Sequence, residues 1–236
     1  MISVCMATYN GEKYLKEQLD SILKQIKSSD ELIISDDGST DSTCTIIREY
    51  QKEYKNINLI DGPKMGVQKN FENALKKSKG DIIFLSDQDD IWMNNKVDVV
   101  LDAFQNPNVV LTLHDAQIVD QNEQVIEDSF FQHRGSQSGL FKNLWKNSYL
   151  GCCMAFRRSV LECSLPFPPK IEMHDWWIGL IGEMMGKVRL IDKTLLKYRR
   201  HGENVSSFQH HPFKKMVKNR CLLYTSPSPR DPKTSR

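Results

Sequence analysis

Short apolar runs alternate with longer amphipathic stretches through the first half of the chain, and this alternation constrains the fold more than any other feature. The apolar runs, typical of buried strands, cover residues 2–7, 31–37, 57–62 and 81–87. The stretches between them have apolar residues at helical spacing and cover residues 11–26, 39–54 and 65–80. Repeated strand-helix units predict a mostly parallel central sheet with helices on both faces and right-handed crossovers. The predicted fold class is therefore α/β, a three-layer sandwich.

The second half of the chain is less regular. The expected elements are helices at 94–105 and 172–186 and strands at 109–120, 123–131, 187–192 and 194–201. No repeat of solenoid length and no hinge-like linker divides this part of the sequence. We therefore expect a single domain over residues 1–207.

The residues after 207 differ in character. Segment 208–220 is basic and has Phe213, Met216 and Val217 on one helical face, which fits either a helix at a membrane surface or a solvated helix end. Segment 221–236 loses all periodicity and is rich in proline, serine and basic residues. That composition predicts a disordered or non-native tail.

Charge and cysteine content narrow the function classes. The 32 basic and 30 acidic residues nearly cancel, which gives no electrostatic argument for nucleic acid as a partner. The apolar start has no basic leader, and no stretch approaches the roughly 20 apolar residues of a membrane span. The six cysteines form no C-x-x-C pair. We expect a cytoplasmic protein with reduced thiols, and peripheral contact with the inner face of the membrane stays open.

Three polar clusters follow three of the predicted strands. They are Thr8–Gly11, Ser35–Ser39 and Ser86–Asp90. Ligands of parallel α/β sheets bind outside the carboxyl ends of the strands. We therefore expect these clusters to converge on one rim of the sheet and to form the binding site.

The third cluster places Asp87, Asp89 and Asp90 within four positions. Carboxylates a few ångströms apart repel by about 1 kcal/mol even in water, so this crowding predicts a cation. In an extended segment, Asp87 and Asp89 would face one site and Gln88 would point away. Their oxygens suit Mg²⁺ or Mn²⁺. The alternative is a cap for the helix at 94–105, a role that we expect of Asp90.

A second acidic pair, Asp36 and Asp37, ends the second predicted strand. Such carboxylates accept hydrogen bonds from ribose hydroxyl or base N–H groups, although an Asx-turn or a helix cap explains them equally well. The chain has neither GxGxxG nor GxxxxGK[ST], which argues against a dinucleotide dehydrogenase and a P-loop NTPase. A nucleotide would be bound here without a phosphate-cradling glycine loop, which increases the need for a metal.

Five motifs resemble, in order and spacing, the family 2 glycosyltransferases, which have the Rossmann-like GT-A fold of nucleotide-diphospho-sugar transferases. They are ISVCMATYNGEKYL, IISDDGSTDST, GDIIFLSDQDD, HDWW and YRRHGENVS. The resemblance implies transfer of a sugar from a nucleotide diphosphate donor, with inversion at the anomeric carbon, to a glycan or lipid-linked acceptor. The last two motifs look similar to rhamnosyltransferase-like members that build bacterial cell-surface polysaccharides. That similarity implies dTDP-rhamnose as donor, and a UDP-hexose stays open.

The resemblance assigns donor-side roles by position. Asp87 and Asp89 match the DXD motif at the donor and the metal. The implied nucleotide-binding residues are Thr8, Tyr9, Asn10, Glu12, Asp36, Asp37 and Asp87, and the implied metal ligands are Asp89 and His201. A neutral imidazole is a good ligand for Mn²⁺, and Arg199 or Arg200 could meet the phosphates. A solvated basic strand end is the competing interpretation of this last segment.

Asp175 matches the catalytic base of the family. A carboxylate between aromatic residues is partly desolvated, which raises its pKa and makes it a better base for an acceptor hydroxyl group. The alternative is a cap for the following helix, and His174 alone is expected to be structural. The implied acceptor-side residues are Gly151, Cys152, Trp176 and Trp177. We expect one tryptophan to stack on a sugar and the other to fill the core, and Gly151 and Cys152 fit a plain core role equally well.

The expected function is that of an inverting, divalent-metal-dependent glycosyltransferase. Two alternatives come from other classes. A metal-dependent phosphoryl or nucleotidyl transferase would use Asp87 and Asp89 but would not need Asp175. A catalytically silent nucleotide-sugar-binding module would bind a donor without turnover.

Overall fold

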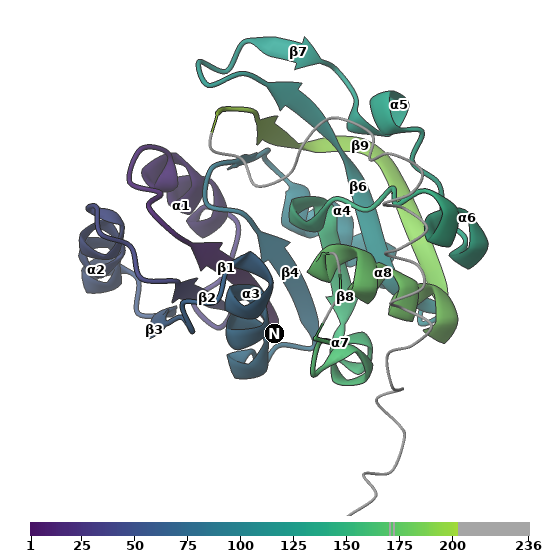
Figure 1. Cartoon of the computed structure of the whole chain (residues 1–236), viewed down its shortest axis with the longest axis horizontal. Coiled ribbons are helices and arrows are strands. Elements are labelled where there is room, and N and C mark those ends of the chain that lie inside the picture. Colours follow the sequence, from purple (N-terminus) through teal and green to yellow (C-terminus); the bar gives the residue numbers. More distant parts are fainter. Residues whose placement is uncertain (170, 172, 203–236) are drawn as a thin grey trace, which may run out of the picture.

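The first half of the chain forms the four strands and three helices expected of it (Figure 1). The computed structural model describes residues 1–169, 171 and 173–202, so the predicted segments 208–220 and 221–236 lie outside the described residues. The elements are β1 (Ile2–Thr8), α1 (Leu15–Leu23), β2 (Glu31–Asp36), α2 (Thr43–Glu53), β3 (Ile57–Asp61), α3 (Val67–Lys77) and β4 (Ile82–Ser86).

Among the described residues, the second half adds four short helices, the 12-residue helix α8 and two long strands. The elements are β5 (Ile91–Trp92), α4 (Lys96–Ala103), β6 (Val109–Val119), β7 (Val125–Glu127), α5 (Phe130–Arg134), α6 (Leu140–Trp145), the 3-10 turn η1 (Gly151–Cys153), β8 (Met154–Arg157), α7 (Arg158–Ser164), α8 (His174–Met185) and β9 (Lys187–Arg199). Within the described part of the chain, no helix has the length and apolar character needed to cross a bilayer.

Two predictions for the second half are wrong. The strands expected at 187–192 and 194–201 are one strand, β9, whose register with β6 shifts between Ile191 and Thr194. The polar pair between these two residues is accommodated within the strand as an irregularity rather than as a turn. The strand expected at 123–131 stops at Glu127, because the Ser129 side chain accepts a hydrogen bond from Gln132 N–H and starts helix α5.

All described strands join one sheet in the order β3-β2-β1-β4-β8-β6-β9-β5, and β7 pairs with β6. Strands β1, β2, β3, β4, β6 and β9 run in one direction, and β5, β7 and β8 run in the other. The predicted mostly parallel sheet is therefore confirmed. Thr8 is in register with Asp36, and Met6 with Ser86, so the carboxyl ends of β1, β2 and β4 lie at the same edge.

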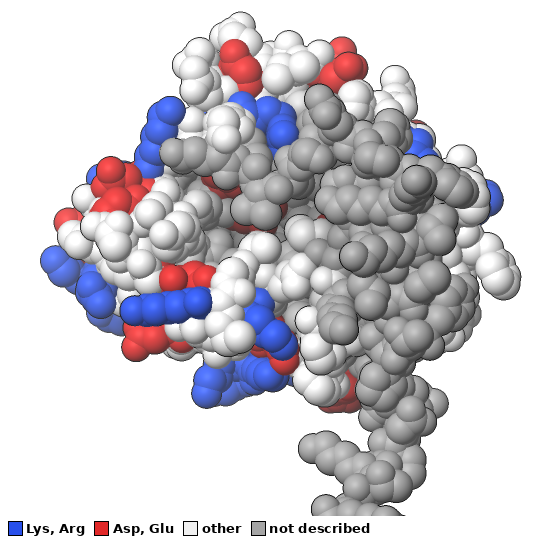
Figure 2. Space-filling model, in the orientation of Figure 1, with Lys and Arg blue, Asp and Glu red and all other residues white. Residues whose placement is uncertain are grey.

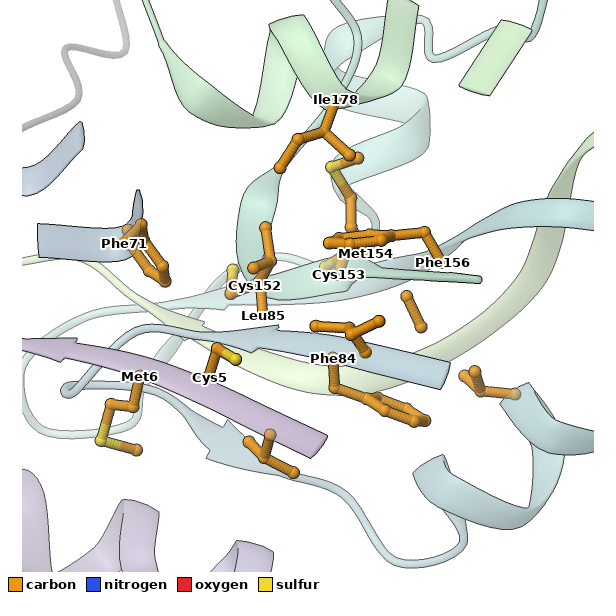
Figure 3. Packing of buried hydrophobic residues seen from close by; sticks show 14 of the residues in the cluster. Cys5, Met6, Phe71, Phe84, Leu85, Cys152, Cys153, Met154, Phe156 and Ile178 are labelled. Carbon is orange, nitrogen blue, oxygen red and sulfur yellow. The ribbon is translucent and has the colours of Figure 1, made fainter. Parts of the chain in front are cut away.

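Helices cover both faces of the sheet and give the three predicted layers. Helix α1 has Leu15, Leu19 and Ile22 on one face, all fully buried, because residues three and four apart share a side of a helix. Figure 3 shows Ile178 of α8 and Phe71 of α3 on the opposite face, above the strands that carry Cys5 and Leu85. The core therefore extends through both halves and holds the edge where β1, β2 and β4 end.

Candidate active site

A cleft of about 1110 Å³ opens at the carboxyl ends of β1, β2 and β4. Figure 2 shows acidic side chains in a hollow near the middle of this face, where Figure 1 places the end of β4. The predicted site residues that line the cleft are Thr8, Tyr9, Asn10, Asp37, Asp87, Asp89, Gly151, Asp175 and His201. The convergence expected from the three strand ends is confirmed.

Asp36 organises the loop that follows β2. Its Oδ1 accepts a hydrogen bond from Ser39 N–H at 2.8 Å, and its Oδ2 accepts from the hydroxyl groups of Ser39 (2.6 Å) and Thr8 (2.9 Å). Burial disfavours the charged carboxylate, but these hydrogen bonds outweigh burial and lower the pKa of Asp36. Asp36 therefore has the turn role that was one of its two predicted roles. Asp36 and Thr8 together hold the loop after β2 in place at the edge of the cleft.

Asp37 lies at the cleft and fixes a second part of its wall. Its two carboxylate oxygens accept hydrogen bonds from the backbone N–H groups of Lys64 (2.7 Å) and Gly66 (2.8 Å), in the connection between β3 and α3. Gly66 has a φ of 86°, a conformation that favours glycine. This connection is missing from the sequence-based prediction, although the rule for strand ends applies to β3 as it does to its neighbours. The cleft-lining residues here are Lys64, Met65 and Gly66 of this connection and Val67, Gln68 and Asn70 of helix α3.

The loop after β1 presents Tyr9 and Asn10 to the cleft. Tyr9 is 57% exposed, and Asn10 Oδ1 accepts a hydrogen bond from Thr40 N–H at 2.9 Å. Glu12 has a different role, because its Oε2 accepts from Ser42 N–H (2.8 Å) where α2 begins. Glu12 is not one of the described residues that line the cleft. The structure therefore places Glu12 at the terminus of helix α2 and not with the other residues predicted to bind the nucleotide.

Gln88 ties the loop after β4 to the loop after β1. Its Oε1 accepts a hydrogen bond from Tyr9 N–H at 2.9 Å, and its Nε2 donates to Tyr9 O at 3.0 Å. A Cβ atom on Gly11 would lie 2.4 Å from Oε1, so a larger residue there would displace the amide. The prediction that Gln88 points away from the site is wrong, because strand periodicity ends with β4 at Ser86.

Asp87 and Asp89 both line the cleft. Burial, followed by the charges of Asp89 and Asp175, raises the pKa of Asp87 to about 7. His201 Nε2 lies 2.7 Å from Asp89 Oδ2, and the His201 ring lies 5.0 Å from that of Tyr14. Because Nε2 cannot bind a metal while it is hydrogen-bonded to Asp89, His201 supports Asp89 in this structure.

Asp90 is fully buried behind this wall and does not cap α4, contrary to the prediction. Its Oδ1 accepts a hydrogen bond from Arg199 N–H at 3.0 Å, while the residue before α4 is Asn95. Its Oδ2 has no hydrogen-bond partner in the described structure, and burial raises the pKa of Asp90 well above its ordinary value. Beneath it, the fully buried Lys96 donates to Cys152 O at 2.8 Å and lies 4.0 Å above the Trp92 ring.

The acidic residues present fit a divalent cation. Ligand atoms of Asp87, Asp90 and Cys152 lie within 4.8 Å of one another. Burial raises the pKa of the Cys152 thiol well above its ordinary value, and a protonated thiol is a poor ligand for a hard cation. The carboxylates therefore supply the suitable donors in this group, Asp87 at the cleft and the unpaired oxygen of Asp90 behind it, and Asp89 lines the cleft beside them.

Asp175 lies in the first turn of α8 and lines the cleft. It is 8% exposed; its Oδ1 accepts from Trp176 N–H at 2.7 Å, and its Oδ2 accepts from Gly151 N–H at 3.1 Å. Asp175 does not occupy the cap position of α8, which is Met173, so the cap role considered as the alternative is not the one observed. Gly151 holds the carboxylate closely, since a Cβ atom on it would lie 3.4 Å from Asp175 Cβ.

Three further sequence-based assignments need correction. Trp176 and Trp177 are both core residues, 5% and 9% exposed, whose indole N–H groups donate to Asn143 O and Ser164 O. Neither they nor the buried Cys152 belong to the described residues that line the cleft. Arg199 is 3% exposed and donates a hydrogen bond to Asp89 O (3.0 Å). Its side chain therefore stabilises the loop of residues 87–90, called the acidic loop below, instead of binding phosphates. Side-chain direction on α8 and β9 follows core packing, which the local sequence did not reveal.

This sheet, with an acidic cleft at the carboxyl ends of its first strands, defines a protein of the GT-A class. Two solved structures share the fold. One is the crystal structure of S. aureus TarS 1-349 in complex with UDP-GlcNAc, with a TM-score of 0.73, 22% identity and coverage of 95% of this chain and 67% of that chain. The other is the mannosyltransferase PcManGT from Pyrobaculum calidifontis in complex with GDP-Man and Mn²⁺, with a TM-score of 0.59, 21% identity and coverage of 82% and 54%.

Sequence comparison identifies the family. Residues 3–165 match the family model described as Glycosyl transferase family 2. The dTDP-rhamnosyl transferase RfbG of Shigella flexneri is 30% identical over 215 residues, which cover 84% of this chain and 72% of that protein. The chain therefore belongs to glycosyl transferase family 2, a family of EC 2.4 glycosyltransferases, and the resemblance is confirmed. It spans 66% and 60% of the length of two other curated relatives.

Proposed function

We propose that the chain is an inverting glycosyltransferase that binds a nucleotide diphosphate sugar in the cleft. The observation that carries this proposal is the convergence of Asp37, the Asp87 and Asp89 pair, and Asp175 on one cavity. Asp37 and the exposed Tyr9 suit a base and ribose, while the acidic pair suits a metal-bound diphosphate. Family membership and a fold shared with two nucleotide-sugar complexes support the same conclusion.

In the proposed reaction, Asp175 accepts the proton of an acceptor hydroxyl group. The acceptor oxygen then forms a bond to the anomeric carbon while the bond from that carbon to the diphosphate breaks on the opposite face, which inverts the configuration. Gly151 N–H holds Asp175 Oδ2 in place at 3.1 Å. Asp87 and Asp89 would hold Mg²⁺ or Mn²⁺, which when bound neutralises charge on the departing nucleotide diphosphate.

The donor that we propose is dTDP-rhamnose, with a UDP-hexose as the alternative. The name of the Shigella relative supports rhamnose, and the TarS complex with UDP-GlcNAc supports a uridine nucleotide. The proposed acceptor is a glycan or a lipid-linked glycan in cell-surface polysaccharide synthesis. Such an acceptor would place the protein in the cytoplasm, in contact with the inner face of the membrane.

The donor site can be tested by calorimetry with dTDP-rhamnose, UDP-glucose and UDP-GlcNAc, each with and without Mn²⁺ or Mg²⁺. We expect at least one donor to bind the native chain more tightly with metal. We expect Asp89→Ala to remove that dependence, because the variant lacks a cleft carboxylate and the partner of His201. Glu49→Ala, which removes an exposed carboxylate on α2, is the matched control and should bind like the native chain. An Asp89→Ala variant that binds the donor as tightly as the native chain and keeps the native dependence on metal would reject the metal role of Asp89.

A further inference from the structure

His174 is a buried polar residue of the cleft that the proposed reaction does not use. It is the first residue of α8, directly before Asp175, and it lines the cleft at 3% exposure. Both ring nitrogens are buried and have no hydrogen-bond partner among the described residues. Buried polar groups in native proteins are nearly always paired, so two unpaired nitrogens on one ring at a cleft wall need an explanation.

The surroundings of His174 fix its ring and direct one edge to the acceptor side. The ring stacks on Phe71 with centroids 4.1 Å apart and an angle of 23° between the planes, and Phe167 lies 6.4 Å away. A Cβ atom built on Gly151 would lie 3.5 Å from Nε2 and 3.7 Å from Asp175 Oδ2. The imidazole edge and the proposed base therefore border the same small space beside Gly151.

The chemistry of this edge suits a neutral ligand group. Burial lowers the pKa of His174 to about 3, so the ring is uncharged at physiological pH. A neutral imidazole offers one N–H donor and one lone pair, which match a hydroxyl group and provide no charge for a phosphate. A phenylalanine would pack against Phe71 equally well without leaving polar atoms unpaired, so packing alone does not explain a histidine here.

We propose that His174 is an acceptor-binding residue, whose imidazole hydrogen-bonds to a hydroxyl group of the acceptor sugar next to the hydroxyl group that Asp175 deprotonates. This inference rests on the proposed function and extends it to the acceptor. It assigns sugar recognition on the acceptor side to His174, in place of the two tryptophans, which are not among the described residues that line the cleft.

The test uses the full chain with ¹⁵N-labelled histidine, and the His174 signals are assigned with His174→Gln. The nucleoside diphosphate is added first, with dTDP and UDP in separate experiments in a buffer that contains Mg²⁺ and no Mn²⁺, followed by the methyl glycosides of N-acetylglucosamine, glucose, galactose and rhamnose. We expect at least one of the two nucleotides to move the signal of His201, which lines the donor side, and at least one glycoside to move the imidazole signals of His174. Calorimetry should show roughly 10-fold weaker glycoside binding by His174→Phe, partial recovery by His174→Gln, and unchanged binding of that nucleotide by both variants.

His114→Phe is the matched control, because His114 is also buried with an unpaired Nε2 but lies on β6, outside the described cleft lining. It should bind glycosides like the native chain. The inference is overturned if no glycoside moves the His174 signals, if the nucleotide alone moves them, or if His174→Phe binds glycosides at native strength. Absence of binding of both dTDP and UDP would instead contradict the proposed function itself, and this inference with it.

Discussion

At the scale of single residues, Gln88 joins the two loops that carry the proposed donor site. Its amide pairs with both backbone polar groups of Tyr9, in the way that a neighbouring strand would. Gly11 leaves the space in which that amide lies. Gln88 is therefore a positioning residue, which sets the distance between Tyr9 and the two aspartates that flank Gln88, Asp87 and Asp89.

This pairing predicts that two different substitutions have the same effect. Gln88→Ala removes the amide, and Gly11→Ala displaces it, so each should weaken nucleotide binding by about 1 kcal/mol, roughly 5-fold. Calorimetry on the single and double variants checks the coupling. The double variant should be no worse than either single one, whereas additive losses would show that Gly11 and Gln88 act independently.

His174 provides a pH-dependent prediction. Because burial lowers the pKa of His174 from 6.5 to about 3, the unfolded chain binds a proton between these pH values that the native state does not bind. Stability due to the neutral ring is therefore lost as pH falls below about 6.5. Relative to the native chain, His174→Phe should gain about 2 kcal/mol in unfolding free energy between pH 7 and pH 5. Urea titrations at pH 7 and pH 5 measure the unfolding free energies of both chains. If the difference between the variant and the native chain were the same at both pH values, the ring would titrate normally.

Sequence reasoning locates the acidic residues of the site well and the other side chains poorly. Asp37, Asp87 and Asp89 could be placed because strand ends of a parallel sheet meet at one edge. Asp175 could be placed only through the family resemblance. Gln88 could not, because the loop after β4 does not keep the alternation of a strand. Prediction from sequence is limited in the same way wherever a side chain could point either into the cleft or into the core.

At the scale of elements, the turn from β4 through β5 to α4 supports the acidic loop. Lys96, at the start of α4, is fully buried and donates to Cys152 O, while Arg199 of β9 donates to Asp90 Oδ1 and Asp89 O. Burial lowers the pKa of Lys96 to about 8, so its positive charge persists at neutral pH close to Asp87 and Asp90. The acidic loop thus has a buried cation behind it before any metal binds.

Lys96→Met should lower the unfolding free energy by about 2 kcal/mol, because it leaves Cys152 O without its donor and removes the buried charge while keeping most of the volume. Chemical denaturation at pH 7 measures the change. Lys77→Met, on the exposed side of α3, is the control and should stay within about 0.5 kcal/mol of the native chain. A Lys96→Met variant as stable as this control would show that the acidic loop does not depend on the buried cation.

The elements themselves follow from the sequence most reliably where amphipathic helices separate buried strands. Helices α1, α2 and α3 fall within the predicted stretches, because their apolar faces cover one sheet. Prediction fails in the second half, where β9 continues through a polar pair because it is held along its length by β6. Such long-range pairing leaves little trace in the local pattern.

At the scale of the whole molecule, the cleft lies between two sets of elements with different proposed tasks. The loops after β1, β2, β3 and β4 form the donor side, and η1 with the start of α8 forms the acceptor side. The two meet where Asp87 and Asp175 lie close enough for each charge to affect the other. The fold thus brings the proposed donor site and the proposed base together from residues almost 90 positions apart in the chain.

The most direct test of this account compares binding with turnover in Asp175→Asn. The measurement is release of nucleoside diphosphate from the best donor found by calorimetry, at saturating donor, for the native chain and the variant. We expect donor affinity to stay within about 2-fold and the rate of release to fall by about 10³-fold, because the amide cannot accept the acceptor proton. Native turnover by Asp175→Asn would contradict the account, because release of the nucleoside diphosphate would then not need a base at this position.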